Sequence, residues 1–165
     1  MFDQITTLFI TNLNLENKIS AINIVFNLNF NLSEPRTLEK DFLKELFKTY
    51  KDDSMKDDPK TLRKIIVIVV SASALENNHK NIIKCGFYTQ FKRNINELYE
   101  RLIEANEEIE LFGLVNIALN KKYMHLIYQD LKKIYKIALK NPKIDFKTKV
   151  DLFSECSKFL AKISS

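Results

Sequence analysis

Lysine side chains that could contact phosphate groups are concentrated in one segment towards the end of the chain. Residues 121–149 hold nine lysines and two acidic residues, a formal charge of +7, whereas the whole chain carries +5 and the remainder therefore −2. On a helix with about 100° per residue, six of these lysines share an arc of about 120°, together with His125 and Gln129. The six are Lys121, Lys122, Lys132, Lys133, Lys136 and Lys140.

Two tyrosines, Tyr128 and Tyr135, flank this lysine arc, and Asp130 is the only acidic residue of residues 121–140. Lysine displaces the counterions condensed on nucleic acid, and an aromatic ring can stack on any base. The segment has no arginine, so bidentate reading of base edges is not expected. The pattern favours DNA or RNA binding through the helix 121–140, dominated by backbone contacts and weakly sequence-specific. A merely solvated lysine face and an anionic membrane surface remain alternatives.

An acidic stretch gives a second hypothesis. Residues 97–110 carry six glutamates against the single Arg101. The glutamates are Glu97, Glu100, Glu104, Glu107, Glu108 and Glu110. Such a run is usually a solvated helix face, but it can also dock a basic partner. The alternative function is a protein-interaction module, such as an adaptor, inhibitor or immunity-type protein. Its working surface would be this face or an unpaired apolar patch, and a strand at residues 22–32 could also offer an edge for pairing with another chain.

Residue sets typical of enzymes are absent from the sequence. There is no glycine-rich phosphate loop and no nucleophile elbow, and neither His79 nor His125 has a second ligand at metal spacing. Cys85 follows His79 by six residues, about 240° apart on a helix, so we expect a surface histidine and a buried cysteine. Four aspartates in a polar link could hold Mg²⁺ but are better explained as a solvated loop: Asp52, Asp53, Asp57 and Asp58. We predict a non-enzymatic protein with no metal or cofactor.

The apolar run Ile65–Val70 decides between helix and strand in the middle of the chain. Asp58–Pro59 is a strong helix start, and Gly86 suits the end of a helix. These signals favour a buried helix that could break at Asn77–Asn78. Six consecutive β-branched residues argue for a strand instead.

The N-terminal region alternates between polar and apolar residues. In residues 22–32 every even position is apolar, and every odd position except Val25 is asparagine, as in a half-buried strand. Residues 5–15 alternate partially. We therefore expect a predominantly α-helical, compact multi-helix bundle over 37–163, with a small β-hairpin within 1–32, in a single domain 1–165. If 65–70 is a strand, the fold is α+β with a three-stranded N-terminal sheet.

Composition sets the remaining limits. The chain of 165 residues is 45% hydrophobic and 28% charged, with 2 glycines, which suits a globular helical protein. Its two cysteines have no paired spacing, and the N-terminus lacks the pattern of a signal peptide, so we expect a reducing, cytoplasmic location. The longest apolar run would span only about 16 Å as a helix, against a membrane core of about 30 Å, so no membrane span is expected.

Overall fold

The computed structural model describes most of the chain. The described residues are 2–11, 14–31, 35–101, 109–118, 120, 122–124, 128–130, 132, 133, 136, 140, 147, 154, 157 and 161. The chain divides into two compact units, Met1–Phe87 and Tyr88–Ser165. Every regular element in the described ranges is a helix, so the mainly α-helical prediction is confirmed. The assignment of the whole chain to one domain stays a prediction.

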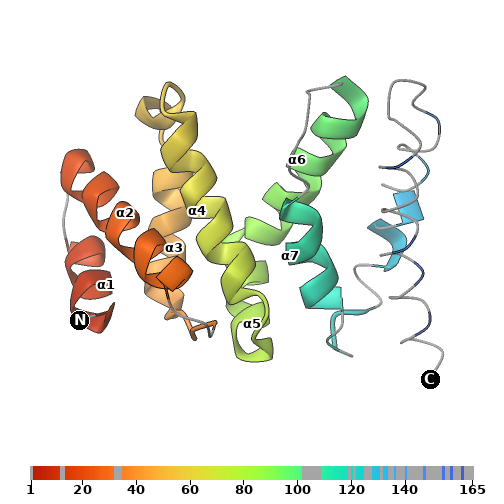
Figure 1. Cartoon of the computed structure of the whole chain (residues 1–165), viewed down its shortest axis with the longest axis horizontal. Helices are drawn as coiled ribbons and strands as arrows, with labels where there is room; N and C mark the ends of the chain where they lie inside the picture. The colour runs from red at the N-terminus through yellow and green to blue at the C-terminus, as the bar shows by residue number, and fades with distance from the viewer. Residues whose placement is uncertain are drawn as a thin grey trace. The chain divides into compact units, whose positions relative to one another are not determined.

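Within its described residues, the first unit contains five α-helices and one short 3₁₀ helix (Figure 1). They are α1 (Phe2–Thr11), α2 (Leu15–Asn31), α3 (Lys40–Tyr50), η1 (Asp53–Met55), α4 (Pro59–Ala72) and α5 (Glu76–Cys85). Helix α1 packs on α2 and α3, α2 packs along α4, and α3 packs on both α4 and α5. Helix α6 (Phe87–Arg101) begins where this unit ends, and the second unit continues with α7 (Ile109–Ala118).

The predicted N-terminal β-hairpin is wrong, because α1 and α2 occupy this region. Among the residues of α2 whose side chains are described, those buried are Lys18, Ile22 and Val25, which are spaced four and three apart as on one helix face. Val25, the residue that broke the alternation, is fully buried, whereas Ile24 is 45% exposed. The alternating pattern therefore gave the wrong secondary structure. The residues that are buried against α4 follow the helical spacing of three and four, and not the spacing of two that a strand would show. Asparagine, which fills most of the odd positions, is also a poor strand former.

The segment Ile65–Val70 lies inside α4, so the helical interpretation is confirmed and the three-stranded sheet is wrong. Asp58 caps the helix by accepting a hydrogen bond from the backbone N–H of Thr61 at 3.0 Å, and Pro59 follows in the first turn. Most of this apolar run is buried against α2 and α3, and that burial outweighs the weak helix preference of β-branched residues. The helix ends at Ala72, before the predicted break at Asn77–Asn78.

Buried polar groups hold the turn between α4 and α5. The Asn78 side chain accepts from the N–H of Leu38 and donates to the carbonyls of Arg36 and Ala72, each at 2.8 Å. His79 Nε2 lies 2.7 Å from the carbonyl oxygen of Ser73. His79 is 1% exposed, so its predicted surface position is wrong, because the neighbouring turn supplies a polar partner inside the fold.

Helix α5 ends at Cys85 and is capped by Gly86, which has a φ of +99° and confirms the predicted glycine terminus. A Cβ at this position would lie 2.7 Å from Phe47 Cζ, so packing as well as backbone conformation requires glycine. Cys85 beside it is half-buried, more exposed than expected.

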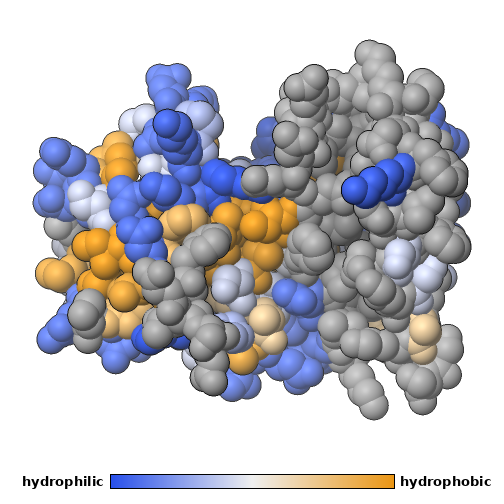
Figure 2. All heavy atoms as spheres, in the orientation of Figure 1, coloured by the Kyte–Doolittle hydropathy of each residue, from blue (hydrophilic) through white to orange (hydrophobic). Residues whose placement is uncertain are grey.

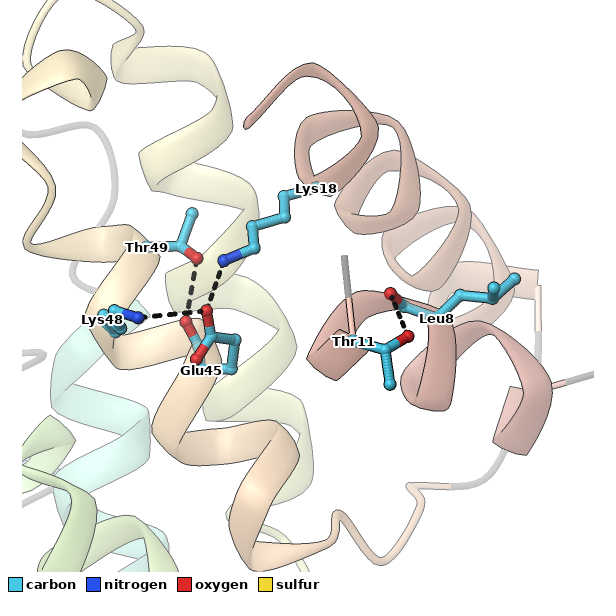
Figure 3. A network of polar contacts seen from close by, with 6 residues as sticks. All are labelled: Leu8, Thr11, Lys18, Glu45, Lys48 and Thr49. Atoms are coloured by element: carbon cyan, nitrogen blue, oxygen red, sulfur yellow. Dashed lines mark hydrogen bonds and ion pairs between the residues drawn. The ribbon is translucent and has the colours of Figure 1, made fainter. Parts of the chain in front are cut away.

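An ion pair joins α2 to α3 close to the apolar core. Lys18 contacts the Glu45 carboxylate, and Lys48 lies 3.9 Å from the same carboxylate (Figure 3). The Thr49 hydroxyl donates to the backbone carbonyl of Glu45 at 2.9 Å. The Lys18 ammonium also lies 5.9 Å from the centre of the Phe9 ring, a cation–π distance. Lys18 is thus buried with a compensated charge.

Within the described residues, no helix has both the length and the apolar character needed to cross a membrane.

Candidate nucleic-acid interface

The described members of the predicted lysine set are all exposed to solvent. They are Lys122, Lys132, Lys133, Lys136 and Lys140. The last four have helical backbone, whereas Lys122 lies in a turn. Lys121, His125 and Tyr135 lie outside the described residues. Within the described part of the chain, none of the five exposed lysines forms an ion pair.

Asn120 lies after α7 and directly before the lysine segment, residues 121–149. Its side-chain oxygen accepts a hydrogen bond from the backbone N–H of Lys122 at 3.0 Å. Its carbonyl accepts from the N–H groups of Tyr123 and Met124, at 2.9 and 3.1 Å. This is the arrangement by which asparagine begins a helical turn, and it fixes the backbone at Lys122. Tyr123 and Met124 are half-buried.

Tyr123 lies beside Lys122, and Tyr128 lies in the next described stretch, residues 128–130. The Lys122 ammonium is 5.7 Å from the centre of the Tyr123 ring. Tyr128, predicted as a stacking residue, is helical and half-buried, while its neighbour Gln129 is exposed. A half-buried tyrosine presents part of its ring to solvent while the rest packs against protein. Its exposed part is what a base would contact.

Asp130, the acidic residue of this segment, is held by two side chains of α6. The Tyr88 hydroxyl donates to Asp130 Oδ2, and the Lys92 ammonium lies 3.0 Å from the same oxygen. The Lys92 ammonium is also 5.0 Å from the centre of the Tyr88 ring. Burial, reinforced by the bond to the Asp130 carboxylate, raises the pKa of Tyr88 far above its usual value. Tyr88 therefore remains a protonated donor throughout the physiological pH range.

Sequence reasoning missed Tyr88 and Lys92 as partners of this segment. The two residues are four apart on α6 and so lie on the same helix face. Asp130 is the only acidic residue of residues 121–140, and a partly buried carboxylate needs a compensating partner. These two signals were present, but the pairing spans 38 residues between Lys92 and Asp130 and leaves no local pattern.

The predicted acidic face contains residues in different environments. Glu97 pairs with Arg93, whose Nε lies 2.9 Å from the carboxylate. Glu110 is 9% exposed and accepts a hydrogen bond from the Asn94 side chain at 3.2 Å, so it is not part of a solvated face. The Glu100 side chain and residues 102–108 lie outside the described parts.

Two of the aspartates considered for metal binding make local contacts in the polar link. Asp52 caps η1 by accepting from the N–H of Ser54 at 3.0 Å, and Asp53 pairs with Lys56 at 2.7 Å. Burial raises the pKa of the Cys85 thiol, which disfavours the nucleophilic thiolate. Over the described ranges, no three histidine, cysteine, aspartate or glutamate side chains group as metal ligands would.

Comparison with known proteins gives no match on which a functional argument could rest. No protein-family model matches the chain, and no significant similarity to a curated protein or to a solved structure is found.

Proposed function

We propose that this protein is a non-catalytic nucleic-acid-binding subunit, an accessory or structural component of a nucleoprotein assembly. The observation that supports this most directly is the exposure of the five described lysines between positions 122 and 140, with no acidic partner among the described residues. An exposed ammonium group that is not engaged by a carboxylate can exchange its counterion for a phosphate. The contacts are to the backbone, so sequence specificity is weak.

The distribution of charge also supports the proposal. Residues 88–165 hold 14 basic and 10 acidic residues, a net +4, whereas residues 1–87 hold 12 and 11, a net +1. Most of the excess positive charge therefore belongs to the unit that contains the lysine segment. Local positive charge of this kind steers polyanions and supplies their non-specific affinity.

The test reverses three exposed lysines in one variant, K132E/K133E/K136E. We expect fluorescence anisotropy with short single- and double-stranded DNA and RNA, at about 50 mM salt, to show micromolar or tighter binding by the wild type. The variant should bind at least about a hundredfold more weakly, because three attractive charges become repulsive. Circular dichroism on heating shows whether the variant still folds.

A matched control changes the net charge equally in the first unit. The variant K40E/K60E/K80E replaces three exposed lysines there and has the same net charge as the test variant. It should retain most of the affinity if the lysine segment is the binding site. Equal losses in both variants would indicate a general charge effect, and unchanged affinity in the test variant would refute the assignment.

A protein-interaction role is the second candidate, favoured by apolar side chains on the N-terminal helices. Leu8 of α1 is 61% exposed and Ile24 of α2 is 45% exposed. Figure 2 shows apolar side chains at the surface of this region. Apolar surface that is exposed to solvent is typical of contact sites for another protein. Such a role as adaptor, inhibitor or immunity-type protein would use the helices α1 and α2, since the described residues offer no strand edge.

Light scattering coupled to size-exclusion chromatography tests this second candidate. Self-association that is lost in an L8E/I24E variant, with its helical content retained, would support a contact surface on α1 and α2. A monomer at every concentration, together with nucleic-acid binding by the wild type, would favour the first proposal.

A further inference from the structure

We propose that Lys92 of α6 is a charge-compensating residue of the nucleic-acid surface, and that it acts by neutralising Asp130. This inference rests on the proposed function. Asp130 is the single acidic residue within 121–140, two and three positions before Lys132 and Lys133. Its carboxylate is 25% exposed and lies 3.0 Å from the Lys92 ammonium, whose side chain is 29% exposed. Lys92 therefore extends the interface from the lysine segment to α6.

The electrostatic argument concerns what Asp130 would do without this partner. An unpaired carboxylate repels phosphate groups over roughly a Debye length, about 10 Å at 0.1 M salt. Lys132 and Lys133 follow Asp130 by two and three positions, so their backbones lie within about that range. Pairing with Lys92 compensates the charge of the carboxylate. The nearby lysines then attract phosphate groups without an opposing negative charge.

Tyr88 is the positioning residue of the couple. It is 4% exposed, and its hydroxyl donates to the same carboxylate oxygen that Lys92 contacts. A buried donor on α6 restricts the orientation of the Asp130 side chain and keeps the oxygen within reach of the ammonium. Since the Lys92 ammonium also lies against the Tyr88 ring, one face of α6 holds both groups that the carboxylate needs.

The experiment measures anisotropy with one single-stranded oligonucleotide at about 50 mM salt for the wild type and four variants. K92M removes the ammonium but keeps the apolar stem, and K92R keeps a cation. K92M/D130N also neutralises the carboxylate. K92M/E97Q is the matched control: it has the same net charge as K92M/D130N, but the carboxylate that it neutralises pairs with Arg93 on α6.

We expect K92M to bind roughly fivefold more weakly, because one attractive charge is lost and one repulsive charge is uncovered. K92R should bind as the wild type does. K92M/D130N should recover most of the lost affinity, whereas K92M/E97Q should stay weak. Thermal melting of each variant shows whether it remains folded. A loss of affinity that comes from unfolding is thereby recognised.

The outcomes separate the two proposals. Absence of binding by the wild type would overturn the proposed function and this inference with it. Binding by the wild type that K92M leaves unchanged would overturn this inference alone. If K92M/D130N stays as weak as K92M, and the slope of log affinity against log salt falls by about 0.7, Lys92 contacts phosphate directly and the compensating role is wrong.

Discussion

Asn78 shows how much of the first unit depends on a single buried polar side chain. It connects the extended stretch before α3, the end of α4 and the start of α5, through three hydrogen bonds of 2.8 Å. The side chain is fully buried. A buried amide with partners for its oxygen and its nitrogen specifies one arrangement of the backbone around it, because each alternative leaves a polar group unsatisfied.

Replacing Asn78 by alanine should therefore destabilise the protein strongly. The N78A variant leaves the N–H of Leu38 and the carbonyls of Arg36 and Ala72 without this partner, and we expect a loss of about 2–4 kcal/mol in the free energy of unfolding. Urea denaturation followed by circular dichroism measures it. The control is N77A, in which the neighbouring asparagine is exposed, and it should change stability by less than about 0.5 kcal/mol. Equal effects in the two variants would contradict the assigned role.

At this scale, the sequence predicts residues that act on their immediate neighbours. Asp58, Pro59 and Gly86 were recognised because capping depends on positions within one turn. Asn78 was placed only at a possible helix break, since its partner Leu38 is 40 residues away. The link from Lys92 to Asp130 was missed for the same reason.

At the scale of elements, α2 and α4 show the limit of reading periodicity. Both segments carried patterns that fitted a strand, yet both are helices that pack along each other. In α4 the capping residues Asp58 and Pro59 correctly indicated a helix. In α2 no such signal was recognised, although Asn14 lies directly before the helix and its side-chain oxygen accepts from the N–H of Glu16 at 2.8 Å. An asparagine cap of this kind is a helix start that the alternating pattern concealed.

The cap of α4 gives a pH-dependent prediction. The hydrogen bonds from Thr61 hold the pKa of Asp58 below its ordinary value of 3.8. Because folding lowers this pKa, the cap stabilises the protein fully above about pH 5 and loses its effect as the pH falls through the folded-state pKa. The D58A variant should unfold about 1 kcal/mol more easily at pH 7, and its difference from the wild type should shrink towards pH 2–3.

Urea denaturation at a series of pH values measures this difference, with D57A as the control. Asp57 is exposed and precedes the cap, so its removal should leave the stability nearly unchanged at every pH. A difference between D58A and the wild type that stays constant down to pH 2 would contradict a charged cap.

At the scale of the whole molecule, the groups that stabilise the fold and those assigned to binding are different. The core of the first unit is apolar, and its T-shaped pair Phe9–Phe42 has ring centres 5.2 Å apart. The exposed lysines from 122 to 140 contribute little to stability, since surface charges are screened by solvent. Their grouping was evident from the sequence, as it depends on composition alone. The pairing of Asp130 with Lys92 on α6 was not, because it depends on the fold.

This separation predicts opposite responses to salt. Between about 50 and 200 mM salt, nucleic-acid affinity should fall about a hundredfold if roughly five lysines contact phosphate, while the melting temperature stays nearly constant. Anisotropy and thermal melting of the same sample measure both quantities. In the K132E/K133E/K136E variant, the slope of log affinity against log salt should be shallower by about 2–3, because three counterion-releasing contacts are lost. If the wild type binds with an affinity that does not change with salt, the binding uses apolar contacts instead of phosphate contacts. Leu8 and Ile24 on α1 and α2 would then be the residues to replace.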